Sequence, residues 1–301
     1  MTDNVTQINK NRAFVILLTG AVLVGIAPVM AKIMNLPAIL LVFYRVLLAL
    51  PLFLLLKPFN NKRQSIAHKT IPPYKDLLLL MAAGILFALD MSAFYFSLKF
   101  TSITTATLLG NFSPVFIATG NLFLKKRASK ELFWVLIALT GLILLCGGKP
   151  ELSLTCLQGD MIALTSAFLF TGHILLVNKL GAKYSSIDIM LWSSMGAIAV
   201  LILLCLFFKI NMHIGSWHNF LLLICMAWGS QVIGQTCLTS AIATFPPSFS
   251  SLGILLDPIA AAFFAFLILG ETLSPYEQIG GIIILASIVG AYKAISPAKS
   301  H

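Results

Sequence analysis

Long runs of apolar residues alternate with short polar breaks along almost the whole chain. A helix needs about 20 apolar residues to cross a bilayer, and run after run reaches that length. The pattern predicts ten membrane-spanning helices, over about 13–33, 38–56, 76–98, 102–123, 131–147, 159–178, 186–208, 218–243, 247–269 and 275–295. The breaks between them are too short for a soluble domain, and the longest, about 57–75, is a short basic loop.

The composition agrees with a membrane protein. Of 301 residues, 59% are hydrophobic and 10% are charged, whereas soluble domains average roughly 45–50% and about 25%. This excludes an ordinary soluble enzyme, a nucleic-acid-binding module and a disordered tail. The net charge of +10 comes from scattered basic residues and indicates no nucleic-acid partner. The cysteines form no CxxC pair, so we expect no metal and no cofactor. The predicted fold class is an all-α polytopic membrane protein.

Basic residues lie mostly on one side of this topology, which predicts the orientation. The cytoplasmic side carries the basic loop at 57–75 and those at 125–130 and 179–183, whereas the other side carries only Lys32, Lys99, Lys149 and Lys209. Both termini are therefore predicted to be cytoplasmic. The first apolar run is too long for the core of a cleaved signal, so we expect a multi-pass protein of the cytoplasmic (bacterial inner) membrane.

The two halves of the chain resemble each other. Asn111-Phe112-Ser113-Pro114-Val115 matches Leu255-Leu256-Asp257-Pro258-Ile259, Ser97-Leu98 matches Ala241-Ile242, and Tyr44-Arg45 matches Trp192-Ser193. Because each half holds an odd number of helices, the second must be inverted in the membrane. The predicted domains are two inverted five-helix repeats, at 1–150 and 151–301. Inverted repeats with proline-interrupted helices indicate alternating access around a site near the membrane midplane.

Three motifs in order then carry a resemblance to a known family. They are Arg45-Val-Leu-Leu-Ala-Leu-Pro51, Gly159-Asp-Met-Ile-Ala-Leu164, and the run from Pro258 to Leu269 followed by Gly270-Glu-Thr-Leu-Ser274. Together they resemble EamA-type members of the drug/metabolite transporter superfamily, across nearly the whole chain. The resemblance implies a ten-helix transporter of small metabolites. The first half departs from the pattern, because Lys125-Lys126-Arg127 replaces the usual Gly-Glu turn.

Two acidic residues fall within the predicted spans, where a charge costs roughly 2.5–3.5 kcal/mol. Asp257 precedes Pro258, whose missing N–H frees a backbone carbonyl. The two groups suit a cation or proton site, with a helix cap or a structural pairing as the alternative. Asp90 shares a helix face with Phe87 and Phe94, which suits an amino or quaternary nitrogen. The alternative is that Asp90 is a buried partner for a basic or hydroxyl group elsewhere in the bundle.

Two basic or titratable side chains are also predicted within spans. Arg45, which follows Tyr44, can hold a carboxylate or phosphate, snorkel outward, or neutralise Asp90 or Asp257. Because the family places an arginine here across many substrates, a structural or gating role is favoured. His173 can shuttle a proton, but a satisfied polar residue is the favoured interpretation.

Uncharged polar residues recur at helical spacing within other spans. Trp228, Gln231, Gln235 and Thr239 are predicted to form one continuous stripe, and Asn111 ends a similar row with Thr104 and Thr107. Mid-membrane amides need partners, which a watery cavity or a neighbouring helix provides. The candidate substrate-binding or coupling residues are Asp257, Asp90, Arg45, Gln231, Gln235, Asn111, Trp228, Phe94, Phe87 and Tyr44.

The predicted function is secondary transport of a small polar metabolite, namely an amino acid, an amine or an adenosyl-type compound. The alternative substrate is a phosphorylated or carboxylated anion held by Arg45, and the alternative classes are a channel and an intramembrane enzyme. The sequence lacks Gly-x-Gly-Asp, His-Glu-x-x-His and Gly-x-Ser-x-Gly motifs, so we expect no enzyme. The expected partners are the substrate, the lipid bilayer and protons as candidate coupling ions. A monomer suffices, because ten helices can enclose a cavity by themselves.

Overall fold

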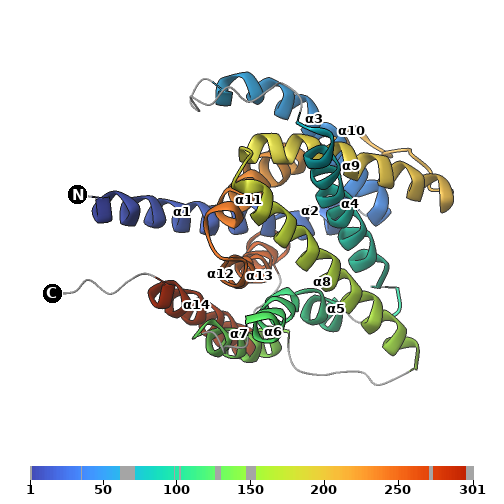
Figure 1. The fold of residues 1–301 in the computed structure, drawn as a ribbon. Helices are drawn as coiled ribbons and strands as arrows, with labels where there is room; N and C mark the ends of the chain where they lie inside the picture. Colours follow the sequence, from blue (N-terminus) through green and yellow to red (C-terminus); the bar gives the residue numbers. More distant parts are fainter. Residues whose placement is uncertain are drawn as a thin grey trace.

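The computed structural model describes residues 2–34, 36–61, 72–97, 99–101, 103–125, 130–146, 154–270 and 274–295. Within these residues every regular element is a helix (Figure 1). The first half contains α1 (Thr2–Gly25), α2 (Ala27–Met34), α3 (Ala38–Asn61), α4 (Tyr74–Ser97), α5 (Ile103–Gly110), α6 (Ser113–Lys125) and α7 (Lys130–Leu145). The second half contains α8 (Leu154–Gly181), α9 (Ser186–Phe207), α10 (Trp217–Cys225), the π-helix η1 (Met226–Gly234), α11 (Gln235–Thr244), α12 (Pro247–Ile254), α13 (Leu256–Leu269) and α14 (Pro275–Ile295).

Eight helical segments in the described part of the chain are long and apolar enough to cross a membrane. They are Lys10–Met34, Ala38–Pro58, Tyr74–Ser97, Leu157–Gly181, Ser186–Phe207, Trp217–Thr244, Pro247–Leu269 and Pro275–Ala294. Leu132–Leu145 is a shorter apolar helix, and the run predicted at 102–123 is divided between α5 and α6. The protein is therefore an all-helical, multi-pass membrane protein, and the count of ten spans stays a prediction.

Two helices are interrupted at matching places in the two halves. α5 ends at Gly110, four residues before Pro114, and α12 ends at Ile254, four residues before Pro258. Proline has no N–H to donate to the carbonyl four residues earlier, and its ring crowds that carbonyl. The predicted interruption by proline is thus confirmed in both halves.

The centre of the bundle is built by α4, which packs against α8 and α9 (Figure 1). The crossing of α4 and α9 is close because glycine lies at the contact on both helices. A Cβ atom at Gly84 would overlap the Ser193 carbonyl, and one at Gly196 would overlap the Met81 carbonyl. Small residues that let backbones approach are typical of helix pairs in membranes, where lipid supplies no hydrophobic driving force.

The beginning of α1 and the end of α14 lie on the same side of the bundle (Figure 1). Tyr292 near the end of α14 donates a hydrogen bond to Asn11 Oδ1 of α1, at 2.5 Å. This arrangement is compatible with termini on one side of the membrane, and the cytoplasmic assignment stays a prediction. Several sequence features lie outside the described residues, namely 62–71 of the basic loop, the turns at 126–129 and 271–273, and the predicted domain boundary at 150/151.

Candidate functional site

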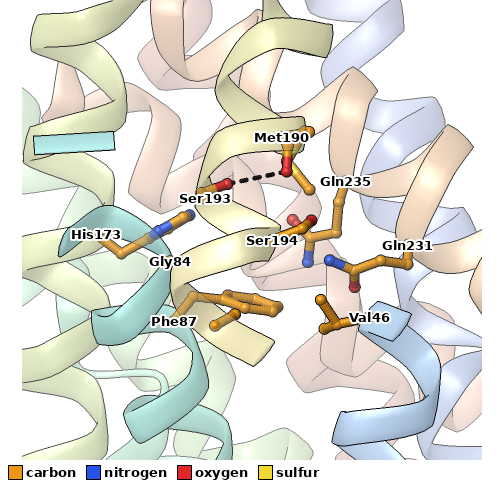
Figure 2. Close-up of a pocket in the computed structure, with 10 residues that line it drawn as sticks. Val46, Gly84, Phe87, His173, Met190, Ser193, Ser194, Gln231 and Gln235 are labelled. Atoms are coloured by element: carbon orange, nitrogen blue, oxygen red, sulfur yellow. Dashed lines mark hydrogen bonds between the residues drawn. The ribbon is translucent and has the colours of Figure 1, made fainter. Parts of the chain in front are cut away.

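A small cavity lies in the middle of the bundle, between the two halves of the chain (Figure 2). Its volume is about 10 Å³, which is close to what one water molecule requires. The first half lines it with Val46 of α3 and with Gly84 and Phe87 of α4. The second half lines it with His173 of α8, with Met190, Ser193, Ser194 and Ala197 of α9, and with Gln231 and Gln235 of η1 and α11.

Both halves of the chain contribute to this cavity. The internal match of Tyr44-Arg45 with Trp192-Ser193 pairs Val46 with Ser194, and the match of Ser97 with Ala241 pairs Phe87 with Gln231. This pairing of positions is a prediction from the sequence. All four residues line the cavity, which is therefore formed by residues of both halves.

Several polar atoms around the cavity have unused hydrogen-bonding capacity. Gln231 Oε1 and Ser194 Oγ are buried and have no hydrogen-bond partner among the described residues. Ser193 Oγ donates to the Met190 carbonyl at 3.3 Å (Figure 2). Buried polar groups are normally paired, and those that are not need an explanation. A bound solute or water in the cavity supplies one.

His173 is fixed from two directions at the edge of the cavity. Its side chain is buried, and its Nδ1 lies 2.9 Å from the Ala83 carbonyl oxygen of α4. The imidazole stacks on Phe170 with 5.8 Å between ring centroids and an interplanar angle of 11°, and it lies 5.4 Å from the Phe87 ring. The ring thus has one defined orientation beside the cavity.

Three of the residues predicted from the sequence are brought together here, Phe87, Gln231 and Gln235. Thr239, one α-helical turn after Gln235, is buried and its hydroxyl donates to Met190 Sδ at 3.2 Å. The structure therefore contains the buried polar stripe over Gln231, Gln235 and Thr239.

The prediction that Trp228 belongs to this polar stripe is wrong. Trp228 is 50% exposed, whereas Gln231 is 1% exposed. The cause is η1, because a π-helix has i→i+5 hydrogen bonds and a wider turn than the α-helix that the spacing assumed. The wider turn rotates Trp228 out of line with Gln231 and onto the outer surface of the bundle.

Arg45 and Asp257 are buried behind the cavity rather than within its lining. Arg45 is 3% exposed and donates from Nη2 to Ser230 Oγ at 3.1 Å, which joins α3 to η1 beside Val46 and Gln231. Its Nε has no hydrogen-bond partner among the described residues. Asp257 Oδ1, in the first turn of α13, has none either. The two charges lie within electrostatic range of each other.

Asp90, Phe94 and Asn111 lie around the break between α5 and α6 instead. Asp90 is 3% exposed and accepts a hydrogen bond from Ser166 Oγ of α8 at 2.7 Å. The Phe94 ring lies against Gly110, and Asn111 donates to the Thr107 carbonyl at 2.8 Å. The Asp90 carboxyl therefore has a structural partner, as one of the two interpretations anticipated.

Polar contacts also join the helices that line the cavity. Lys57 of α3 forms an ion pair with Asp188 of α9 at 3.6 Å. Asp76 of α4 accepts hydrogen bonds from Lys183 and Tyr184, and burial together with Asp76 raises the pKa of Tyr184 to about 12. The hydroxyl of Tyr44, a predicted site residue on α3, donates to the Met212 carbonyl at 2.8 Å.

Ser193 and Ser194 were not predicted as cavity residues, and a structural role as a satisfied polar residue was favoured for His173. The signal for the serines was present, because Ser193 is the internal match of Arg45. The described residues contain no group of three or more His, Cys, Asp or Glu side chains that could hold a metal ion.

Comparisons with known proteins agree with the two-repeat architecture. The model of the EamA-like transporter family matches this chain twice, over residues 11–147 and 157–293. A protein of Archaeoglobus fulgidus named an uncharacterized transporter is 27% identical over 270 residues, which cover 87% of this chain and 88% of that protein. A solved crystal structure with 15% identity superposes with a TM-score of 0.76, covering 92% of this chain and 97% of the other, and so shares the fold.

Proposed function

Because this chain belongs to the EamA-like transporter family, we propose that it moves a small polar organic metabolite across the cytoplasmic membrane by alternating access through the central cavity. The substrate classes are amino acids, amines and adenosyl-type compounds. Two inverted repeats, residues 1–150 and 151–301, form the moving halves, and one chain suffices. Both termini lie in the cytoplasm.

The observation that carries this proposal is the composition of the cavity. Val46 and Ser194, and likewise Phe87 and Gln231, are equivalent positions of the two repeats, and all four face the same space. In transporters built from inverted repeats, the substrate lies between the repeats and each repeat rocks against the other. A site made from equivalent positions can open to either side of the membrane by equivalent motions.

The size of the cavity shows that this conformation has no room for a metabolite. A volume of about 10 Å³ holds a water molecule only. Polar contacts join the helices that line it, namely the ion pair of Lys57 with Asp188 and the hydrogen bond of Tyr44 to the Met212 carbonyl. Substrate entry requires these helices to separate, which is the motion that alternating access demands.

For energy coupling we propose Asp257. One of its buried carboxylate oxygens has no hydrogen-bond partner among the described residues, and the side chain lies at a helix break within electrostatic range of Arg45. A proton or a cation bound to this carboxylate changes its attraction to Arg45. Binding of the coupling ion is thereby linked to the position of α13 relative to α3. Asp90 is the weaker candidate, because Ser166 already satisfies one of its oxygens.

The alternative functions require the same residues to be arranged differently. An anionic substrate held by Arg45 requires the guanidinium to enter the cavity, whereas its Nη2 is engaged by Ser230. A channel needs a continuous pore, whereas this cavity of about 10 Å³ has room for one water molecule. An intramembrane enzyme needs a catalytic pair, whereas Asp90 and Asp257 lie beside different helix breaks.

The test is flux into proteoliposomes that contain the purified protein, with radiolabelled amino acids, amines, adenosyl compounds and sugar phosphates. We expect saturable uptake of one cationic or zwitterionic class, and faster exchange when the same solute is present inside. Flux that rises linearly with concentration and shows no exchange acceleration would indicate a channel. Uptake confined to phosphorylated solutes would overturn the substrate class.

A further inference from the structure

We propose that the cavity binds a primary ammonium group and that His173 is one of the residues that hold it. The inference rests on the proposed function and names the substrate group that the same cavity selects. It assigns a binding role to a histidine whose sequence context favoured a structural one.

The Ala83 carbonyl determines which nitrogen of His173 carries the proton. A carbonyl oxygen only accepts hydrogen bonds, so Nδ1 must be the donor across their 2.9 Å contact. In the neutral imidazole, Nε2 is then the acceptor. Figure 2 shows the ring reaching from α8 to the space between Gly84 and Ser193. The rings of Phe170 and Phe87 hold it there.

Two further acceptors line the same space. The Ser193 hydroxyl donates its hydrogen to the Met190 carbonyl, so its lone pairs can accept a hydrogen bond from a ligand. Gln231 Oε1 is a buried carbonyl oxygen with no partner among the described residues. His173 Nε2, Ser193 Oγ and Gln231 Oε1 are thus three acceptors around one cavity, and a primary ammonium carries three N–H donors and no acceptor.

The remaining lining favours a cation over an anion. Phe87 places an aromatic ring on the first-repeat side of the cavity, where a desolvated cation gains from the ring face. Arg45, the basic residue nearest in sequence to this lining, donates to Ser230 and is absent from it. The donors in this lining are the neutral amides of Gln231 and Gln235 and the Ser194 hydroxyl, so a carboxylate would meet no positive charge among the lining residues.

Three probes of similar shape separate hydrogen bonding from charge. They are phenethylamine, its N,N,N-trimethyl analogue and phenylacetate, each tested by the melting temperature of the purified protein in detergent. We expect phenethylamine to raise the melting temperature with saturation, because only this probe has N–H donors and a positive charge. The trimethyl compound has the charge without the donors, and phenylacetate has neither. Equal stabilisation by the trimethyl compound, or stabilisation by phenylacetate alone, overturns the inference.

A matched pair of variants tests His173 itself. In His173→Asn the shorter amide can still donate to the Ala83 carbonyl but removes the acceptor at Nε2, whereas in His173→Gln the amide reaches the Nε2 position. Losing a hydrogen bond to a charged group predicts about tenfold to hundredfold weaker phenethylamine binding in His173→Asn. Weaker loss is expected in His173→Gln. Wild-type affinity in His173→Asn contradicts the role.

The outcomes also distinguish this inference from the proposed function. If the protein transports a solute without N–H donors, saturably and with exchange, the transporter assignment stands and the ammonium site fails. If His173→Asn does not fold, the preference of the wild-type protein among the three probes still decides the question. Absence of any phenethylamine binding overturns the ammonium site regardless of flux.

Discussion

The two sides of the cavity have opposite chemistry, although the internal sequence matches pair their positions. The first half supplies Val46, Gly84 and Phe87, which carry no polar side-chain atom, while the second half supplies every polar residue of the lining. In the proposed mechanism, similar backbones let both repeats perform the same motion in opposite directions. The unlike side chains then bind the solute in one orientation. The proposal thus assigns movement to the symmetry of the fold and recognition to the asymmetry of the side chains.

The largest expected effect comes from breaking the close crossing that brings the two sides together. Gly84→Val places a branched side chain where the Ser193 carbonyl lies. We expect a loss of about 3 kcal/mol, the upper end of the typical cost of overpacking a well-packed contact, and a sharp fall in monodisperse protein. Size-exclusion chromatography and the melting temperature measure it. Gly120→Val is the control, because a Cβ there meets nothing within 4 Å, and an equal loss in the control would contradict the explanation.

The second effect concerns coupling behind the cavity. Asp257→Asn keeps the shape and removes the charge, so we expect accumulation against a gradient to be lost while the protein stays folded. Imposed pH gradients across proteoliposomes measure accumulation. Asp90→Asn is the matched control, and it should retain coupling because Ser166 already occupies that carboxyl. Wild-type accumulation by Asp257→Asn, with unchanged pH dependence, would remove this residue from coupling.

A third change makes the polar side of the cavity more apolar. Gln231→Leu removes a buried carbonyl oxygen that has no hydrogen-bond partner in the part of the chain that the structure describes, so we expect an equal or higher melting temperature. Transport should fall about tenfold, the effect of losing one hydrogen bond to a charged group. Flux and thermal denaturation, measured on the same preparation, check the expected fall in transport and the expected change in melting temperature. A lower melting temperature with normal flux would show that Gln231 is structural.

The smallest effect is expected from making one equivalent pair identical. Ser194→Val gives both predicted repeats a valine at this position and removes a hydroxyl that has no hydrogen-bond partner among the residues described by the structure. A single neutral hydrogen bond contributes about 0.5–1.5 kcal/mol, so flux should fall by roughly threefold to tenfold with folding retained. Competition between phenethylamine and apolar amines then shows whether selectivity for polar solutes declines as well. An unchanged Michaelis constant would place Ser194 outside the binding surface.

Much of the fold follows from the sequence because membranes impose simple rules. The apolar runs predicted most of the helices, and the prolines predicted both breaks, at Gly110 and at Ile254, because a missing N–H acts locally. The split of the run at 102–123 also follows from Pro114. The glycine contact between α4 and α9 could not be predicted, since it depends on which helices are neighbours.

The site was only partly predictable for two physical reasons. Helical spacing identified Gln231, Gln235 and Phe87, but it failed at Trp228 because η1 is a π-helix, and its wider turn leaves no mark in the spacing. The position of Asp90 within an apolar span, on one helix face with Phe87 and Phe94, predicted a functional role, whereas its partner Ser166 lies on a helix distant in sequence. For His173 the deciding contact is the Ala83 carbonyl, a backbone atom that no side-chain pattern reveals.

The central claim is that the cavity between the repeats is the path of the substrate, and the reactivity of a cysteine at Ser194 tests it most directly. In a background in which the native cysteines are replaced, Ser194→Cys is nearly isosteric, and Trp228→Cys on the outer surface is the control. We predict that a membrane-impermeant methanethiosulfonate reagent modifies the cavity cysteine from both sides of the membrane. Saturating transported solute should slow this reaction and leave the control unchanged. A cavity cysteine that reacts from neither side, or whose reaction the solute does not slow, would contradict the account.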